Sequence, residues 1–121
     1  MELEDSILVT IKRLLGIGEN YEAFDQEIMV FVNGAIIKLG QLGIGPPGGF
    51  CITGVEEDWS DLLGDKQDQL QSAKDYIYFD VRLSWDPPTQ SSVINAWNEK
   101  LKELTWRLLH QVEDSAPAVT E

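Results

Sequence analysis

The sequence has few of the residues from which catalytic and disulfide-stabilised proteins build their sites. It contains one cysteine, Cys51, and one histidine, His110, in 121 residues. A single cysteine cannot form an internal disulfide, which fits a reducing compartment such as the cytoplasm, and we expect its thiol to be buried. A nucleophilic cysteine needs a base beside it. Because His110 falls in a distant, late segment of the chain, no catalytic pair is indicated.

Long apolar runs and basic runs are also missing. No stretch approaches the roughly 20 apolar residues that a membrane-spanning helix needs. The first residues, MELEDS, are acidic where a signal peptide would be basic. Nine Lys and Arg oppose 21 Asp and Glu, for a formal net charge of −12. Since nucleic acid is itself an anion, this composition argues against direct binding of DNA or RNA. We therefore expect a soluble protein with no membrane anchor.

The residues that are present suffice for one folded domain. Hydrophobic residues make up 43% of the chain, which includes four Trp. A chain of this length has room for a single core. We assign residues 1–112 to one helical domain and residues 113–121, which are mostly polar, to a flexible acidic tail.

Apolar residues recur every three or four positions in most of the chain, which predicts an all-α fold. Four principal helices are expected, together with a short one near residues 59–63. The first covers residues 5–15 and is capped by Asp5 or Ser6. The second begins at residue 21 or 25 and ends at 42, and the others cover residues 65–85 and 91–112. The second has the strongest amphipathic pattern, although Gly34 and Gly40 each weaken it by about 1 kcal/mol. Close packing against a neighbouring helix would explain these two glycines. Asp86, Pro87 and Pro88 are expected to end the third principal helix.

The segment GIGPPGGFCITG, residues 43–54, predicts a long ordered Gly/Pro-rich loop between the second helix and the short one. It lacks the lysine and the spacing of a phosphate-binding loop. Phe50 and Ile52, in its apolar centre, are expected to pack against other apolar residues. The sequence leaves open whether these belong to the core of the same chain or to a neighbouring subunit.

Acidic residues suggest two kinds of site, and both have simpler explanations. A cluster of acids in residues 56–65 could hold a hard cation, but it lacks the spacing of a calcium-binding loop, and acids at a helix start are explained by capping. Pairs such as Glu99 and Glu103 could serve acid/base chemistry, but charges on a helix with intervening lysines usually solvate its surface. We expect no metal, no cofactor and no enzymatic activity.

The last helix has apolar residues on more than one side. Trp97 and Trp106 are nine residues apart, about half a turn out of phase, so they cannot occupy one narrow stripe. Leu104, Leu108, Leu109 and Val112 add to the apolar character of its end. This pattern indicates either an interface at the end of the helix or complete burial within the chain.

Several motifs in a fixed order resemble the head-tail connector, or adaptor, proteins of tailed bacteriophages and prophages. They are a helix that ends in QLGIGP, then GF.I....W.DLL, then K.YIYFDVRLSWDPP, and a closing KLKELTWRLL. Together they cover residues 25–109. None of them is a catalytic motif.

The resemblance implies a small helical protein that forms a ring, commonly of twelve subunits, under the portal at the capsid vertex. Such a ring extends the DNA channel, lets DNA pass without specific binding, and docks the next neck or tail-completion protein. The implied location is the virion neck, after synthesis in the host cytoplasm. The C-terminal helix of this family typically reaches toward the portal, which implies portal contacts by Trp106, Arg107, Leu108, Leu109 and Val112.

The same resemblance makes Ile44, Phe50 and Ile52 candidates for subunit or neck contacts. Part of the acidic excess would face the channel, where it would repel phosphate. Two other functions fit the residues less well. A small acidic regulator or DNA mimic would explain the charge but not the apolar loop, and an enzyme built on carboxylates or Cys51 has no supporting geometry.

Overall fold

The protein is all-α over the residues that the structure describes. The computed structural model describes residues 6–18, 20–64 and 66–115, with the backbone alone at residues 67 and 111–115. Its elements are α1 (Ile7–Leu14), α2 (Asp25–Gln41), α3 (Trp59–Leu63), the 3-10 turn η2 (Gln67–Gln69), α4 (Leu70–Trp85) and α5 (Ser91–Ser115). The four principal helices and the short α3 confirm the predicted fold class. Residues 116–121, in the expected tail, lie outside the described residues.

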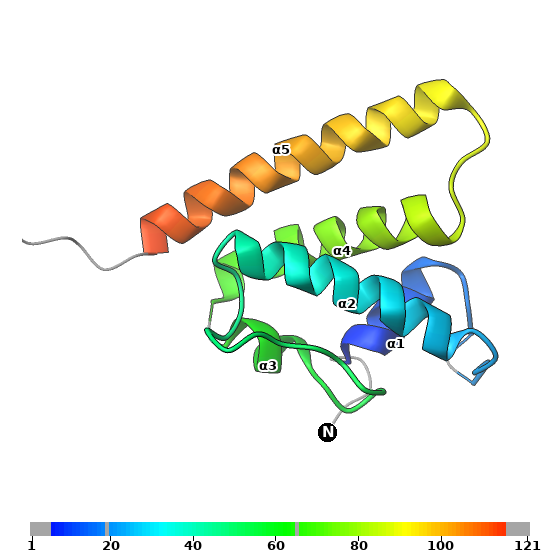
Figure 1. Cartoon of the computed structure of the whole chain (residues 1–121), viewed down its shortest axis with the longest axis horizontal. Coiled ribbons are helices and arrows are strands. Elements are labelled where there is room, and N and C mark those ends of the chain that lie inside the picture. Colours follow the sequence, from blue (N-terminus) through cyan, green and yellow to red (C-terminus); the bar gives the residue numbers. More distant parts are fainter. Residues whose placement is uncertain (1–5, 19, 65, 116–121) are drawn as a thin grey trace, which may run out of the picture.

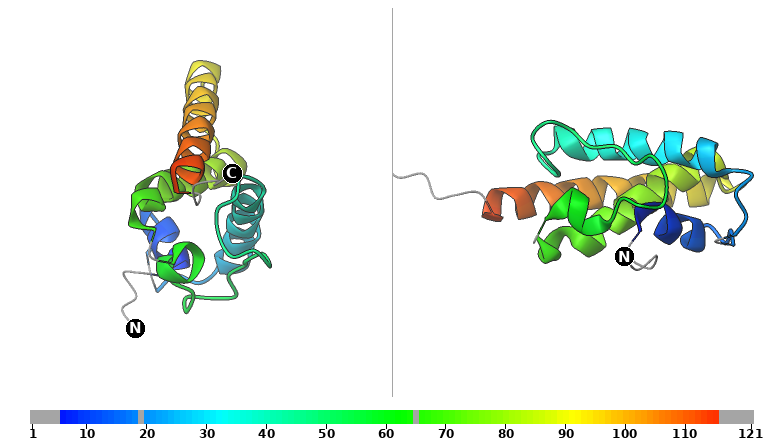
Figure 2. Two further views of the ribbon diagram at one scale, coloured as in Figure 1. Left: turned by 90° about the vertical axis from the view of Figure 1, so that its left-hand side faces the viewer. Right: turned by 90° about the horizontal axis from the view of Figure 1, so that it is seen from below.

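Helix α4 is the centre of the arrangement. It contacts α2 and α1 on one side and α5 on the other (Figure 1). The end-on view shows α1 to α4 grouped around a common core, with α5 projecting from one side of this group (Figure 2). We call α1 to α4 the body of the molecule.

The ends of the helices are set by capping side chains, glycine and proline. The Ser6 side chain accepts a hydrogen bond from the backbone N–H of Val9 and caps α1. Helix α1 ends before Gly16, whose φ of 81° suits glycine. Helix α4 ends at the predicted proline pair, but it begins at Leu70, five residues later than expected, because η2 precedes it. Asp5, the alternative cap for α1, lies outside the described residues.

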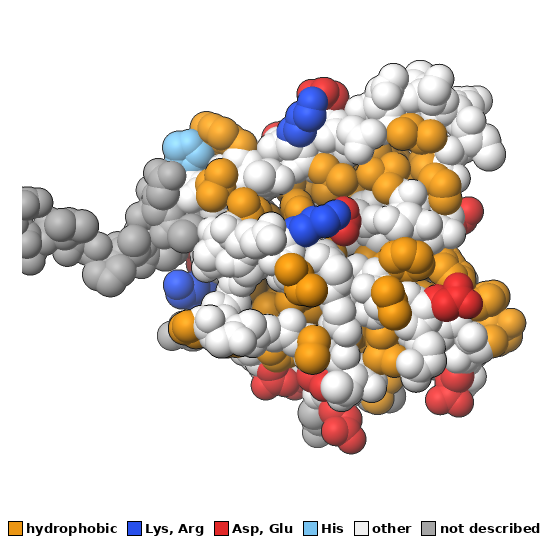
Figure 3. Space-filling model, viewed as in Figure 1, with side chains coloured by type: hydrophobic (Ala, Val, Ile, Leu, Met, Phe, Trp, Pro, Cys, Tyr) orange, Lys and Arg blue, Asp and Glu red, His pale blue; other side chains and the backbone are white. Residues whose placement is uncertain are grey.

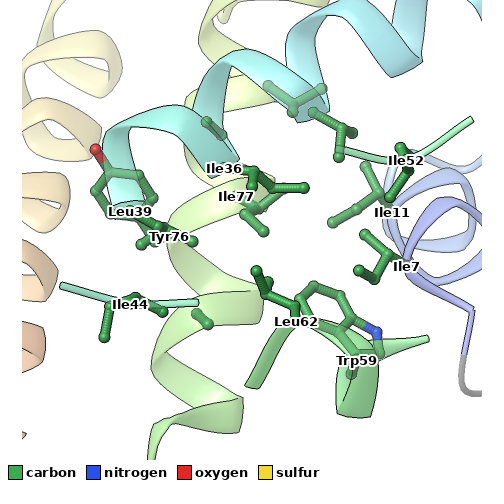
Figure 4. Packing of buried hydrophobic residues seen from close by; sticks show 14 of the residues in the cluster. Ile7, Ile11, Ile36, Leu39, Ile44, Ile52, Trp59, Leu62, Tyr76 and Ile77 are labelled. Atoms are coloured by element: carbon green, nitrogen blue, oxygen red, sulfur yellow. The ribbon is translucent and has the colours of Figure 1, made fainter. Parts of the chain in front are cut away.

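The core is apolar and draws on α1 to α4, on α5 and on the loop after α2. Its fully buried members include Ile7, Val32, Ile77 and Leu104 (Figure 4). One charged side chain, Lys12, is buried beside them. Its Nζ lies 2.8 Å from the carbonyl oxygen of Tyr21 and 2.8 Å from Oδ1 of Asp25, which joins α1 to the start of α2. Both interactions compensate the lysine for the loss of water.

Helix α2 differs from the prediction on its outer side. Its inner stripe is buried as expected, but Val30 and Ile37 point outward and are 68% and 60% exposed. A Cβ placed on Gly34 or Gly40 would meet no atom of a neighbouring element within 4 Å. The expectation that these glycines permit close packing against another helix of the chain is therefore wrong. The neighbours of α2 lie on its other face.

Candidate interaction surfaces

The loop between α2 and α3 is fastened to the body by one asparagine. Asn33 of α2 accepts from the backbone N–H of Ile52 at 2.7 Å and donates to its carbonyl oxygen at 3.0 Å. This double hydrogen bond satisfies the polar backbone groups that a loop brings against a core. It holds the segment Phe50 to Thr53 along α2.

Two of the three predicted loop contacts belong to the chain's own core. Ile44 and Ile52 are each 2% exposed and pack among Ile36, Leu39 and Trp59 (Figure 4). Of the three, only Phe50 keeps a half-buried position at the surface. For Ile44 and Ile52, the open question between own core and neighbouring subunit is answered in favour of the core in this chain.

Phe50 borders a pocket at the C-terminal end of α2. The pocket has a volume of about 260 Å³. Its lining is uncharged and largely apolar, and comes from α2 and the loop: Ile36, Ile37, Gly40, Gln41, Ile44, Pro46, Pro47, Gly49 and Phe50. It is a place for an apolar group to bind.

Cys51 is exposed, so the prediction of a buried thiol is wrong. Asn33 pairs with the backbone of Ile52 as a neighbouring strand would. In such a segment successive side chains point to opposite sides, so the inward position of Ile52 turns Cys51 outward. Sequence reasoning had no signal for this contact, because Asn33 lies 19 residues before Ile52.

The acids near α3 serve the local backbone. The carboxylate of Glu57 accepts hydrogen bonds from the Thr53 hydroxyl at 2.6 Å and from the Gly54 N–H at 3.3 Å. Burial alone would raise the pKa of Glu57, but hydrogen bonds from Thr53 and from nearby backbone N–H groups outweigh it and lower the pKa. Asp61 accepts from the N–H of Asp58 at 2.8 Å. Within the described part of the chain, no three potential ligands gather into a metal site.

Other carboxylates lie beside basic side chains. Asp80 of α4 lies 2.9 Å from Nζ of Lys38 on α2, and this hydrogen bond, assisted by the charge of Asp80, raises the pKa of Lys38 despite its partial burial. On α5, Glu99 pairs with Lys102, and Glu103 pairs with Arg107. These pairs lie at or near the surface, where such interactions contribute little. They account for both members of the candidate pair Glu99 and Glu103.

The two tryptophans of α5 face opposite sides, as their spacing predicts. Trp97 is turned toward α4, where its ring meets Phe79 at 5.4 Å between centroids and lies under the guanidinium of Arg82. Trp106 is 63% exposed and contacts the ring of His110. The end of α5 therefore presents an indole to solvent.

The structure separates the five residues that were expected to contact the portal. Trp106, Arg107 and Leu109 are exposed, and Arg107 is bonded to Glu103 at 2.7 Å. Leu108 is fully buried in the core. The side chain of Val112 lies outside the described residues. Trp106 and Leu109 thus form the accessible apolar part of this surface.

The outward side chains of α2, Val30 and Ile37, were missed by sequence reasoning. The buried stripe by itself satisfies the helical period, so extra apolar residues around the helix drew no attention. A helix that is apolar on most sides is expected to be buried on most sides. The apolar residues outside the buried stripe were therefore the sequence signal for contacts on the outer side of α2.

Comparison with known protein families shows to which family the chain belongs. A protein-family model described as "Phage connector protein" matches residues 7–115. This match spans every helix of the structure. The chain belongs to the phage connector family. No curated protein and no solved structure matches the chain.

Membership agrees with the arrangement of the surface. The connector family is structural, and the described surface of this chain includes exposed apolar side chains on α2 and α5. Within residues 6–18, 20–64 and 66–115, the helices are too short or too polar to cross a bilayer. Assembly with other proteins is the role that these surfaces suit.

Proposed function

We propose that this protein is the head-tail connector of a tailed phage or prophage. It forms a ring beneath the portal, extends the DNA channel, and docks the next neck or tail-completion protein. The observation that carries the proposal is the family match over residues 7–115. Apolar surface left exposed at both α2 and α5 supports it, because a ring subunit needs separate contacts for its neighbours and for its axial partners.

The end of α5 is the surface that we propose for the portal. Trp106, Arg107 and Leu109 are accessible there, and Val112 follows on the same helix. Leu108 is left out because it fills the core of its own chain. On the loop, Phe50 alone of the three candidates remains available for subunit or neck contacts.

The charge of the chain supports passage of DNA without binding. With 21 acids against nine bases, a ring of this protein repels phosphate. We propose that part of the acidic excess lines the channel. A map of the assembled neck in which every acid lies on the outer rim would contradict this.

The direct test is a mass measurement with and without the purified portal complex of the same phage. The expected result is a ring of connector subunits on the portal, commonly twelve. A free monomer does not decide the matter, because ring contacts can form only on the template. A chain that stays monomeric and indifferent to the portal would contradict the proposal.

A further inference from the structure

The outer side of α2 forms one continuous face. Val30, Gly34, Ile37 and Gln41 follow one another at helical spacing, and Gly40 lies beside them. We call these five residues the outer face of α2. Its C-terminal part, from Ile37 to Gln41, forms one wall of the 260 Å³ pocket. In the space-filling view, hydrophobic side chains gather over α2, and most acids lie toward the margins (Figure 3).

Nothing within the described chain explains the composition of this face. Val30 and Ile37 are mostly exposed, and the glycines have open space where a side chain would stand. Glycine inside a helix is unfavourable, and neither glycine here has a positive φ that would require it. A partner that approaches the backbone of α2 closely would account for both observations.

The charge distribution indicates what that partner is. Residues 28–55, which contain the outer face and the pocket, include no Asp or Glu and a single base, Lys38. The rest of the chain carries all 21 acids. Two copies of so acidic a protein repel each other through most of their surfaces, and like charges brought together oppose association. Two acids lie beside this segment, Asp80 at Lys38 and Glu57 at Thr53, and both are bonded to it. The outer face and the pocket lining themselves contain no acid, so an acidic copy meets less negative charge there.

The pocket also matches a side chain that the same protein exposes. A cavity of about 150 Å³ holds benzene, so an indole, with nine ring atoms instead of six, needs about 225 Å³ by proportion. The pocket has about 260 Å³. Trp106 is 63% exposed, and residues 104–112 around it contain no acid. The acids of α5 nearest to this stretch are Glu103, which is paired with Arg107, and Glu113. An indole in an acid-free stretch of nine residues is a suitable occupant for an uncharged pocket.

We propose that the outer face of α2 and its pocket bind a second copy of this chain, with Trp106 of one copy seated in the pocket of the next. A contact between two different surfaces generates a ring when it is repeated head to tail, and we propose that arrangement here. As a ring contact it rests on the proposed function. It replaces the portal contact proposed above for Trp106 with a contact to the neighbouring subunit, and it leaves Arg107, Leu109 and Val112 to the portal.

Photo-crosslinking of the full chain tests the contact. Trp106 is replaced by p-benzoylphenylalanine in a nitrogen-15 labelled chain, which is mixed with unlabelled wild-type chain at about 1 mM. Even a contact with a Kd of about 1 mM is well populated at that concentration. After irradiation, mass spectrometry identifies the joined peptides. The expected product links position 106 of the labelled chain to residues 36–50 of the unlabelled one.

Two substitutions in the unlabelled partner form a matched pair. Ile37→Asp places an acid on the outer face, and we expect the yield of this product to fall by about tenfold or more. Leu14→Asp places the same acid on an exposed apolar position of α1 and should leave the yield unchanged. Equal loss for both variants would show general charge repulsion and would overturn the assignment.

The remaining outcomes separate this inference from the proposed function. Products at other residues of the second copy would overturn the α2 contact. Products confined to one chain, or no product, would overturn it if they are found both for the free chain and on the portal complex. The same labelled chain is then assembled on the portal complex. A ring whose crosslinks from position 106 reach only portal would retain the connector function and overturn the α2 contact. Absence of any ring would contradict the connector function itself.

Discussion

The body of the molecule and α5 are built differently. In the body, α4 packs against both α1 and α2, and α3 and the loop close the remaining side with Trp59, Leu62 and Ile52. Helix α5 is the longest element, with 25 residues, yet its main contacts are with α4 and η2. Among its described side chains only Leu104 and Leu108 are fully buried. The core of one chain therefore explains the body but not the length of α5.

This difference teaches where to look for partners. Burial of apolar area is the main term that holds an element in a fold. Helix α5 keeps Trp106 exposed and α2 keeps Ile37 exposed, and these are the positions at which we propose contacts with other chains. The comparison predicts a body that unfolds as a unit and an α5 that opens separately.

The largest expected effect is in the body. Trp59→Ala removes a nearly buried indole and the hydrogen bond from its Nε1 to the Thr10 hydroxyl. We expect the free energy of unfolding, measured by urea titration, to fall by about 3 to 5 kcal/mol. Trp59→Phe keeps most of the apolar volume and should lose much less. A loss below about 1 kcal/mol for the alanine variant would contradict the view that the body is packed more tightly than α5.

The next effect tests whether α5 opens on its own. Leu104→Ala truncates one of its two fully buried side chains and should weaken its docking by about 2 to 3 kcal/mol. Amide hydrogen exchange should accelerate in α5 and stay slow in the centre of α4. The control is Leu109→Ala, which changes an exposed leucine of the same helix. Equal acceleration in α4 and α5 would show that the two regions unfold together.

Much of this architecture was predictable because it depends on local rules. The helical period locates the buried stripes of α2 and α4, Ser6 is a good capping residue, and the proline pair after Asp86 stops α4. The segment YIYFDV has β-branched and aromatic residues that would also suit a strand, but it continues the helical pattern before it and is part of α4.

The surfaces were less predictable because distant contacts decide them. Asn33 turns Ile52 inward and Cys51 outward across 19 residues, and no local pattern reports this. For the same reason, the sequence could not tell which of Ile44, Phe50 and Ile52 would be available for contacts with other chains. The structure buries Ile44 and Ile52 and leaves Phe50 half-buried. The prediction that the glycines of α2 permit close packing against a neighbouring helix was wrong, because no element of the described chain approaches them.

The outer face of α2 gives a smaller effect of opposite sign. Gly40→Ala fills open space on a helix, and we expect the isolated chain to gain about 0.4 to 1 kcal/mol in its free energy of unfolding. Gly45→Ala is the matched control. At Gly45 φ is +103° and a Cβ would lie 3.1 Å from Cδ1 of Leu62, so this variant should be destabilised. Destabilisation by Gly40→Ala would mean that α2 is already packed on its outer side.

A pH-dependent effect tests the loop that closes the body. The pKa of Glu57 is below its ordinary value of 4.5, so its hydrogen bonds stabilise the fold above that pH. The contribution is lost as pH falls through the lower, folded pKa. Glu57→Gln should lose about 0.5 kcal/mol at pH 7 relative to wild type, and this difference should shrink as the pH falls below 4.5. Glu56→Gln, on the exposed surface, should show no such trend.

The smallest expected effect completes the comparison of the two regions. Trp106→Ala removes an indole as large as that of Trp59, but from a position that is 63% exposed. We expect the free energy of unfolding of the isolated chain to change by no more than about 0.5 kcal/mol, because surface substitutions away from packed features usually stay in that range. Urea titration at low chain concentration measures this without contribution from association. A loss comparable to that of Trp59→Ala would show that Trp106 serves its own fold. A negligible loss would leave its exposure to be explained by binding.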